Sequence, residues 1–310
     1  MKLVCSKSNL LTGLQVVSKA VPNKTTMSIL ECILIDSTSG EIKLTANDME
    51  LGIETIIEGE ILEKGIIALD AKIFLEIVRK LPDNDITITT DSNFKTAITC
   101  EKAKFNIIGK SGEDFSYLPM IERNESIIIS QYTLKEVIRQ TIFSISDNDN
   151  NKLMSGELFE INGEEMRVIS LDGHRISIRK IHLKNSYPAK KVVVPGKTLN
   201  EISKILSGDA DKDVTIFFTD KHIVFEFENT TVVSRLIEGE YFKIDQMLSS
   251  DYETKVIIHK KELLDCIDRA TLLIKEGDKK PIIINITDGS MELKINSTRS
   301  EERRVGKECR

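Results

Sequence analysis

The 310-residue sequence predicts an α+β fold of tandem repeated domains, each with two helices and antiparallel sheets. Two observations predict it. First, an amphipathic helix opens each of three stretches, and their central leucines, Leu10, Leu134 and Leu263, lie 124 and 129 residues apart. Second, the segments between helices alternate apolar and polar residues and are separated by turn dipeptides. Such a period is too long for a solenoid, so each period is expected to be a domain.

The first repeat opens with a helix over residues 7–21, whose apolar stripe consists of Leu10, Leu14, Val17 and Val21. A second helix is predicted over residues 70–80, with Asp70 as its N-cap. The apolar face of this second helix is expected to contain Ile73, Phe74, Ile77 and Val78. Strands are predicted over residues 29–36, 41–46, 50–57, 85–90, 95–100 and 104–108.

The second repeat shows the same order, and its second helix lies 125 residues after that of the first, measured from Lys72 to Lys197. Helices are predicted over 132–145 and 196–206, with inward residues Leu134, Val137, Ile138, Thr141, Ile142, Leu199, Ile202 and Leu206. Residues 154–180 are predicted to form three short strands, joined by tight turns at Asn162-Gly163 and Asp172-Gly173. Further strands are expected over residues 214–218, 222–227 and 231–236.

The third repeat is shorter. It contains a helix over 260–275, with Leu263, Ile267, Ala270 and Ile274 inward. Two strands follow over 281–287 and 291–296, joined by Asp288-Gly289. We therefore expect domains at 1–124, 125–250 and 251–297, the last incomplete, and a tail outside the fold at 298–310.

Composition excludes several classes of protein. The net charge is −6 and the pI about 5.5, so the chain is not coated in basic residues, although one face can still be basic. The five cysteines are scattered and odd in number, which fits reduced thiols in the cytoplasm. The four histidines lack metal-ligand spacing, and no apolar run could span a membrane. We expect no metal, no cofactor and no membrane partner.

Basic residues recur on the polar face of every predicted helix, whereas acidic residues gather in the turns between strands, as at Asp209, Asp211 and Asp213. For any single lysine, a solvated helix face is the better explanation. The recurrence across repeats favours a second explanation, in which all the helices together build one basic wall.

Six segments carry a resemblance to a known family. They are LTANDMELGIE (44–54), ALDAKIFLEIVRKLP (68–82), FNIIGKSGEDFSYLP (105–119), MSGELFEINGEEMRVISLDGHRIS (154–177), VVVPGKTLNEISKIL (192–206) and SRLIEGEYF (234–242). In this order they resemble the bacterial DNA polymerase III β subunit, the sliding clamp, from Met1 to about Ser297. The Asp-Gly-His-Arg segment at 172–175, in this setting, is highly specific for that family.

The resemblance implies three domains per subunit and a head-to-tail homodimer that forms a ring, with helices lining the hole and sheets outside. Double-stranded DNA would be held topologically, through many weak phosphate contacts and no base reading. By family position the DNA-facing residues would be Lys24, Lys72, Arg79 and Lys197, and helix phase adds Arg139 and Arg269. The loop at 147–153 departs from similar clamps, because Asn151 and Lys152 stand where an arginine is usual.

The resemblance also implies a pocket for short linear peptides of the replicative polymerase, the clamp loader and repair polymerases. Its residues in this chain would be Met154, Leu171, Gly173, His174, Arg175, Ile176, Phe242, Gln246 and Met247. Phe242 replaces the proline often found there, and the family's C-terminal apolar residues are not in the sequence. The chain as given is therefore not expected to close a stable ring, because its third repeat stops after one helix and two strands.

Alternatives stay open for the Asp-Gly-His-Arg segment. It reads equally as a polar hairpin tip, and Arg175 could be structural, holding the turn by bonding carbonyls. A different function class is a phosphoesterase that uses His174 and Arg175. No phosphate-cradling glycine loop, metal cluster or nucleophile elbow supports it, and no partner that would orient His174 can be identified. We expect a non-catalytic processivity factor.

Overall fold

The computed structural model describes residues 1–146, 151–248, 251–272, 274, 280–287, 289–295 and 305–306. The chain divides into two compact units, a first unit at Met1–Tyr241 and a second unit at Phe242–Arg310. The first unit contains both complete predicted repeats.

The helices of the first repeat begin where the sequence predicts. The Ser6 hydroxyl accepts a hydrogen bond from the Asn9 N–H (3.2 Å) and caps α1. The Asp70 carboxylate accepts one from the Ile73 N–H (2.8 Å), which confirms the predicted N-cap of α2. The elements are β1 (Lys2–Ser6), α1 (Lys7–Val17), η1 (Ser18–Ala20), β2 (Cys32–Asp36), β3 (Ile42–Asn47), β4 (Leu51–Ile57), β5 (Glu60–Glu63), β6 (Ile66–Asp70), α2 (Ala71–Lys80), β7 (Asp85–Thr90), β8 (Lys95–Cys100), β9 (Ala103–Ile108), β10 (Lys110–Ser111) and η2 (Gly112–Asp114).

The second repeat follows the same order of helices and strands. Its first helix is again capped by a serine, since the Ser130 hydroxyl accepts from the Thr133 N–H (3.2 Å). The elements are β11 (Ser126–Ser130), α3 (Gln131–Thr141), η3 (Ile142–Ser144), η4 (Lys152–Ser155), β12 (Gly156–Leu171), β13 (Ile176–Pro195), α4 (Gly196–Ile205), β14 (Asp213–Phe218), β15 (His222–Phe227) and β16 (Thr230–Arg235).

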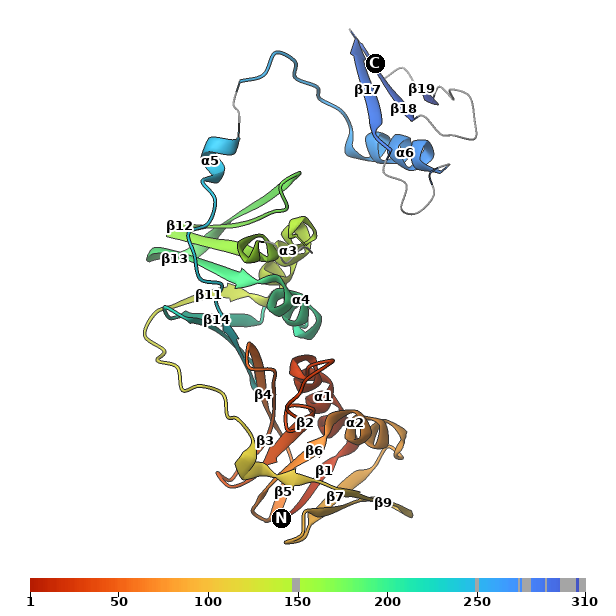
Figure 1. Cartoon of the computed structure of the whole chain (residues 1–310), viewed down its shortest axis with the longest axis vertical. Coiled ribbons are helices and arrows are strands. Elements are labelled where there is room, and N and C mark those ends of the chain that lie inside the picture. Colours follow the sequence, from red (N-terminus) through yellow and green to blue (C-terminus); the bar gives the residue numbers. More distant parts are fainter. Residues whose placement is uncertain are drawn as a thin grey trace. The chain divides into compact units, whose positions relative to one another are not determined.

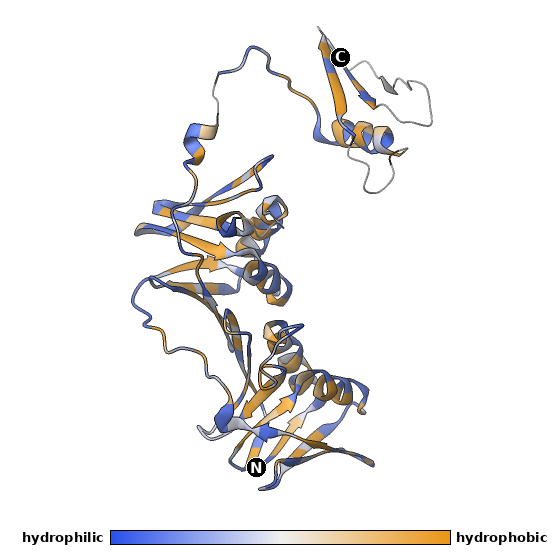
Figure 2. Ribbon diagram, viewed as in Figure 1, coloured by the Kyte–Doolittle hydropathy of each residue, from blue (hydrophilic) through white to orange (hydrophobic). Residues whose placement is uncertain are grey.

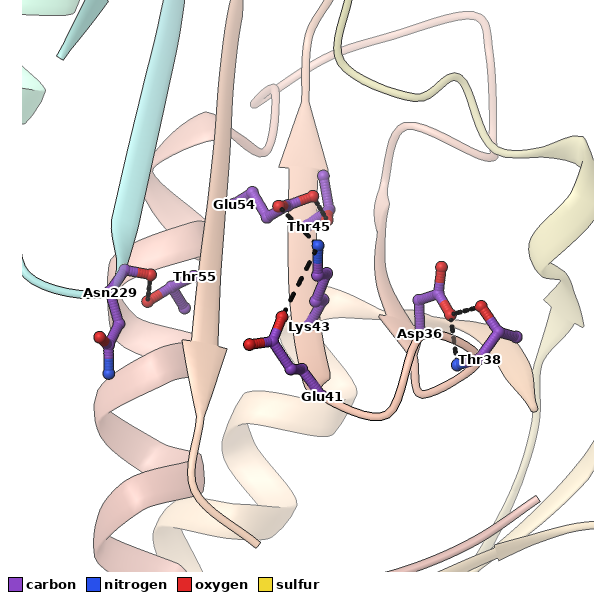
Figure 3. Close-up of polar contacts among 8 residues, drawn as sticks. All are labelled: Asp36, Thr38, Glu41, Lys43, Thr45, Glu54, Thr55 and Asn229. Carbon is purple, nitrogen blue, oxygen red and sulfur yellow. Dashed lines mark hydrogen bonds and ion pairs between the residues drawn. The ribbon is translucent and has the colours of Figure 1, made fainter. Parts of the chain in front are cut away.

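A nine-stranded antiparallel sheet joins the two repeats, in the order β10-β6-β2-β3-β4-β16-β15-β14-β11. The joint is the pairing of β4 with β16, where Ile53 lies opposite Val232. Thr55 Oγ1 donates to the carbonyl of Asn229 at this seam (3.3 Å), as Figure 3 shows. The other sheets of the first unit are β5-β1-β7-β8-β9 and the long pair β12-β13.

One hydrophobic core runs through the first unit. Leu14 of α1, Phe74 of α2, Leu134 of α3 and Leu199 of α4 are all fully buried in it. Helix α1 packs beside α2, and α3 beside α4, and Figure 1 shows each pair lying against the strands of its own repeat. Figure 2 shows the apolar residues concentrated on these strands. The apolar stripes predicted for the four helices are therefore confirmed in their main positions.

Ile73 corrects one of those stripes, because its side chain is 51% exposed. The buried residues of α2 are Ala71, Phe74 and Val78, so the helix turns Ile73 to the edge of its apolar face. The helix predicted over residues 7–21 also ends early, at Val17, and continues as the 3₁₀ turn η1.

Asn162-Gly163 is not a hairpin turn, and the prediction of three short strands in this segment was wrong. β12 runs through it as one strand, and the pairing with β13 shifts register on both sides of Gly163. Gly163 keeps a positive φ of 61°. The dipeptide thus provides an irregularity inside a long strand, which is the other common use of a glycine with positive φ.

The first unit contains strands that have no counterpart in the sequence prediction: β1, β5, β6, β10, β11 and the part of β13 beyond residue 181. The first five are short, so their alternation covers too few residues to be recognised. The remaining predicted strands of both repeats are confirmed, with ends shifted by a few residues.

The second unit contains α5 (Ile244–Met247), α6 (Lys260–Thr271), β17 (Ile282–Thr287), β18 (Ser290–Ile295) and β19 (Val305–Gly306). Its predicted helix and two strands are confirmed, although only Ala270 of the expected inward residues on α6 is buried. Asp288, half of the predicted turn, lies outside the described residues. Within 298–310, Val305 and Gly306 pair with β18. The domain boundaries, including a tail at 298–310, stay predictions.

Candidate nucleic-acid interface and peptide site

The turn between β12 and β13 is organised by Asp172. Its carboxylate Oδ1 accepts hydrogen bonds from the N–H groups of His174 (2.9 Å) and Arg175 (3.0 Å). The Asp172 N–H donates to the Arg175 carbonyl (3.3 Å), so the central residues are Gly173 and His174, one position later than predicted. Gly173 has a φ of 88°, as the first central position of a type II′ turn requires.

Asp172 also fixes the direction of Arg175. Arg175 Nε donates to Asp172 Oδ2 (2.9 Å), and the guanidinium lies over the ring of Phe143, 5.6 Å from its centroid. The His174 N–H, and after it the bonds to Arg175, hold the pKa of Asp172 below its usual value. Arg175 therefore does hold the turn, although through a carboxylate and not through carbonyls. Half-exposed Phe143 was not predicted from the sequence as a residue of this site, and Asp172 was predicted only as a turn residue.

The apolar residues predicted around this turn differ in exposure. Leu171 is fully buried beneath the hairpin, whereas Ile176 and Met154 are half-buried. Met154 lies in η4, which packs against β12, and its carbonyl accepts from the Ser146 N–H (2.8 Å). Gly173, His174 and Arg175 are exposed. The first unit thus presents a polar turn with partly exposed apolar neighbours.

The other three predicted pocket residues belong to the second unit. Phe242 is half-buried, and Gln246 and Met247 are exposed, the latter two on the short helix α5. Met247 is 54% exposed, so an apolar side chain is available for contact. That these residues and the Asp172–Arg175 turn form one pocket stays a prediction.

Three of the six predicted DNA-facing residues are exposed cations. They are Lys24, after η1, and Lys72 and Arg79, both on α2. Among the described residues no ion pair engages them. Lys72 and Arg79 stand on the solvent side of the helix whose opposite side buries Phe74 and Val78. The solvent side of α2 therefore carries both cations, beside exposed Glu76 and half-exposed Ile73.

The other three cations already have partners within the chain. Lys197, in the first turn of α4, forms an ion pair with Asp48 of the β3–β4 turn. Arg139 binds Glu136 through two hydrogen bonds of 2.8 and 2.7 Å. Arg269, in the second unit, donates to Cys266 Sγ (3.1 Å). These three side chains are exposed, so a stronger anion could still displace the partner.

The loop predicted to depart from similar clamps is only partly described. Residues 147–150 lie outside the described residues. Asn151 begins η4, where its side-chain carbonyl accepts from the Leu153 N–H (3.1 Å), and Lys152 is exposed. Asn151 therefore has a structural role at this position.

In the part of the chain that the structure describes, no three His, Cys, Asp or Glu side chains are placed to hold a metal ion. Within the same residues, no helix combines the length and the apolar character needed to cross a bilayer. Cys5, Cys32, Cys100 and Cys266 are free thiols, the first three buried.

The fold defines the class of protein. The DNA polymerase sliding clamp of Bacillus subtilis matches with a TM-score of 0.94 and 32% identity, over 99% of this chain and 83% of that one. A structure from Eubacterium rectale, assigned as a DNA polymerase III beta subunit, has 73% identity and a TM-score of 0.94, over 99% of this chain and 87% of its own. The chain therefore has the fold of a bacterial sliding clamp, with two helices and antiparallel sheets in each complete repeat.

The sequence comparisons give the family. Residues 1–119 match the N-terminal domain and residues 128–243 the central domain of the DNA polymerase III beta subunit. The beta sliding clamp of Staphylococcus aureus is 34% identical over 305 residues, which is 96% of this chain and 81% of that protein. The chain belongs to the DNA polymerase III beta subunit family, the beta sliding clamps. It is a non-catalytic processivity factor, and the phosphoesterase alternative finds no support.

Proposed function

We propose that the protein acts in the cytoplasm as a clamp that encircles double-stranded DNA, in a head-to-tail ring of two subunits with complete third domains. The observation that carries this proposal is that both complete repeats match domains of the beta subunit. The charge distribution supports it, because cations stand on the solvent face of α2 although the chain as a whole carries −6. A ring of this kind would hold DNA without reading its bases.

The proposed DNA contacts differ in how readily they form. Lys24, Lys72 and Arg79 would meet phosphates directly. Lys197 and Arg139 would first give up Asp48 and Glu136. Exposed ion pairs are typically worth about 0–1 kcal/mol, so giving up Glu136 costs Arg139 little and leaves that contact weak. The Asp48 side chain is only 7% exposed, so Lys197 is released less readily. Arg269 would add the same kind of contact from the second unit. Weak contacts suit a protein that must slide.

The proposed partner site is the Asp172–Arg175 turn with Met154, Leu171 and Ile176, completed by Phe242, Gln246 and Met247. Peptides of the replicative polymerase, the clamp loader and repair polymerases would bind here. Asp172 holds the Arg175 guanidinium in one direction before any ligand arrives. Such preorganisation reduces the entropy lost on binding. An apolar side chain of the peptide would be buried, and Arg175 would orient its polar groups.

Alanine substitution tests this partner site. We expect Arg175→Ala and Met247→Ala each to weaken binding of a peptide from the replicative polymerase about tenfold, because truncated anchor residues commonly cost at least 1–2 kcal/mol. Titration calorimetry measures the affinity. Arg179→Ala is the matched control, since Arg179 is exposed on β13, four residues beyond Arg175. Unchanged affinity in both test variants would refute the assignment.

A further inference from the structure

The β3–β4 turn repeats the geometry of the β12–β13 turn. The Asp48 N–H donates to the Leu51 carbonyl (3.0 Å), and Asp48 Oδ1 accepts from the N–H groups of Glu50 (3.0 Å) and Leu51 (2.7 Å). Asp172 makes the same three bonds in the later turn. Met49 has a φ of 76° where Gly173 has 88°. Asp48 and Asp172 are 124 residues apart, the same offset as Leu10 and Leu134. The two turns are equivalent positions of the repeat.

Beside this first turn the structure has a pocket of about 340 Å³. Three segments of the first unit line it: the turn itself, residues 116–119, and the strands β15 and β16 of the second repeat. Its apolar lining includes Met49, Leu51, Tyr117, Leu118 and Val233. The volume lies at the lower end of the range for ligand pockets, roughly 300–1,000 Å³.

Hydrogen bonds and packing hold the three segments together. The Asn47 side-chain amide donates to the Ser116 carbonyl, which ties residues 116–119 to the turn. The Arg235 N–H donates to the Glu50 carbonyl (2.9 Å), which ties the end of β16 to it. Gly52 leaves room for Leu118, since a Cβ at position 52 would lie 2.0 Å from Leu118 Cδ2. The pocket is therefore formed before any ligand binds.

The mouth of the pocket combines exposed apolar area with one arginine and one glutamate. Met49 and Tyr117 are 56% and 57% exposed, an arrangement that commonly marks a contact surface. Arg235 is exposed and lines the pocket together with His222. Burial, and after it the neighbouring charges of Arg235 and Lys221, lower the pKa of His222. Glu50 is the acidic residue among those that line the pocket.

We propose that this pocket is a second docking site for a linear peptide with an apolar or aromatic anchor next to a carboxylate. The anchor would be buried against Leu51, Leu118 and Val233, and the carboxylate would bind Arg235. A guanidinium pairs with a carboxylate through two parallel hydrogen bonds, so the arginine selects an acidic partner. The proposal does not depend on the site at Arg175, because all the residues that line the pocket lie in the first unit.

The experiment uses the full chain carrying Arg175→Ala and Met247→Ala, which disable the site proposed above. The probes are fluorescein-labelled pentapeptides that combine one leucine or phenylalanine with one aspartate at every spacing, and the same set with lysine in place of aspartate. Fluorescence anisotropy measures binding. We expect at least one aspartate peptide to bind with micromolar affinity and its lysine counterpart to bind at least tenfold more weakly.

Further variants locate the binding. Arg235→Glu and Tyr117→Ala should each weaken the aspartate peptide at least tenfold, and both side chains are exposed, so the fold should survive. Lys221→Glu is the matched control, because Lys221 is an exposed cation adjacent to His222 outside the pocket lining. The proposal is overturned if no peptide of the set binds, or if Arg235→Glu has no more effect than Lys221→Glu.

Discussion

At the scale of single residues, two aspartates organise the functional surfaces. Asp172 orders a turn and orients Arg175, and Asp48 orders the equivalent turn and pairs with Lys197. The sequence predicts the turn at Asp172-Gly173, because Asp and Gly are typical turn residues. It could not predict the ion pair, since Asp48 and Lys197 are 149 residues apart and meet only through the fold. The N-cap Asp70 was predictable because its partner, the Ile73 N–H, lies only three residues further along the chain.

Glu157 is a buried carboxyl group in β12 that no proposed function uses. Burial raises its pKa from 4.5 to about 8, against a smaller lowering effect of the Thr141 hydroxyl. Because the folded state binds the proton more tightly than the unfolded state, this group favours folding fully below pH 4.5. The favourable contribution falls as the pH rises and is lost above about pH 8.

We therefore expect Glu157→Gln to stabilise the protein at pH 8.5 by about 2–4 kcal/mol relative to the unsubstituted chain, with the difference shrinking to near zero at about pH 4.5. Urea unfolding at several pH values measures the free energy of unfolding. Glu160→Gln is the control on the same strand, because the Glu160 carboxylate has ion-pair partners in Arg167 and Lys191. A pH-independent effect of Glu157→Gln would contradict this explanation.

At the scale of elements, the dipeptides Asp172-Gly173 and Asn162-Gly163 show where a turn can and cannot be predicted from sequence. Asp172-Gly173 reverses the chain, whereas Asn162-Gly163 lies inside β12. Both glycines have positive φ, which is all that the dipeptide determines. The difference comes from β13, because it pairs with β12 on both sides of Gly163, at residues 190–195 and 176–182. Pairing of this length is set by the strand partner and not by local turn chemistry.

Helix α2 allows the clearest test of the DNA interface. Lys72→Ala with Arg79→Ala should weaken binding to duplex DNA equally on all sequences. It should also reduce the slope of log affinity against log salt by about 2, because each phosphate contact contributes roughly 0.9 to that slope. Lys95→Ala with Lys104→Ala removes the same charge from exposed positions of the β8–β9 sheet and serves as the control. Equal effects of the two double variants, or a preference for one base sequence, would show that α2 is not the interface.

At the scale of the whole molecule, the repeat was predictable and the way its copies join was not. The helix stripes reveal the period, but in the first unit one continuous nine-stranded sheet joins the two repeats. That sheet depends on β4 pairing with β16, for instance Thr55 with Thr230, far apart in the sequence. No local pattern predicts such a pairing. The same junction creates the pocket at Asp48–Leu51, which the sequence analysis did not foresee.

The central claim is that the protein holds DNA by encircling it. The most direct measurement is retention on a nicked circular plasmid before and after the plasmid is cut at one site. The assay uses a dimeric fraction, with its mass checked by light scattering, and a clamp loader. The account predicts a long residence time on the circle and rapid loss once the DNA is linear, at every plasmid sequence. Equal residence times on circular and linear DNA would contradict it.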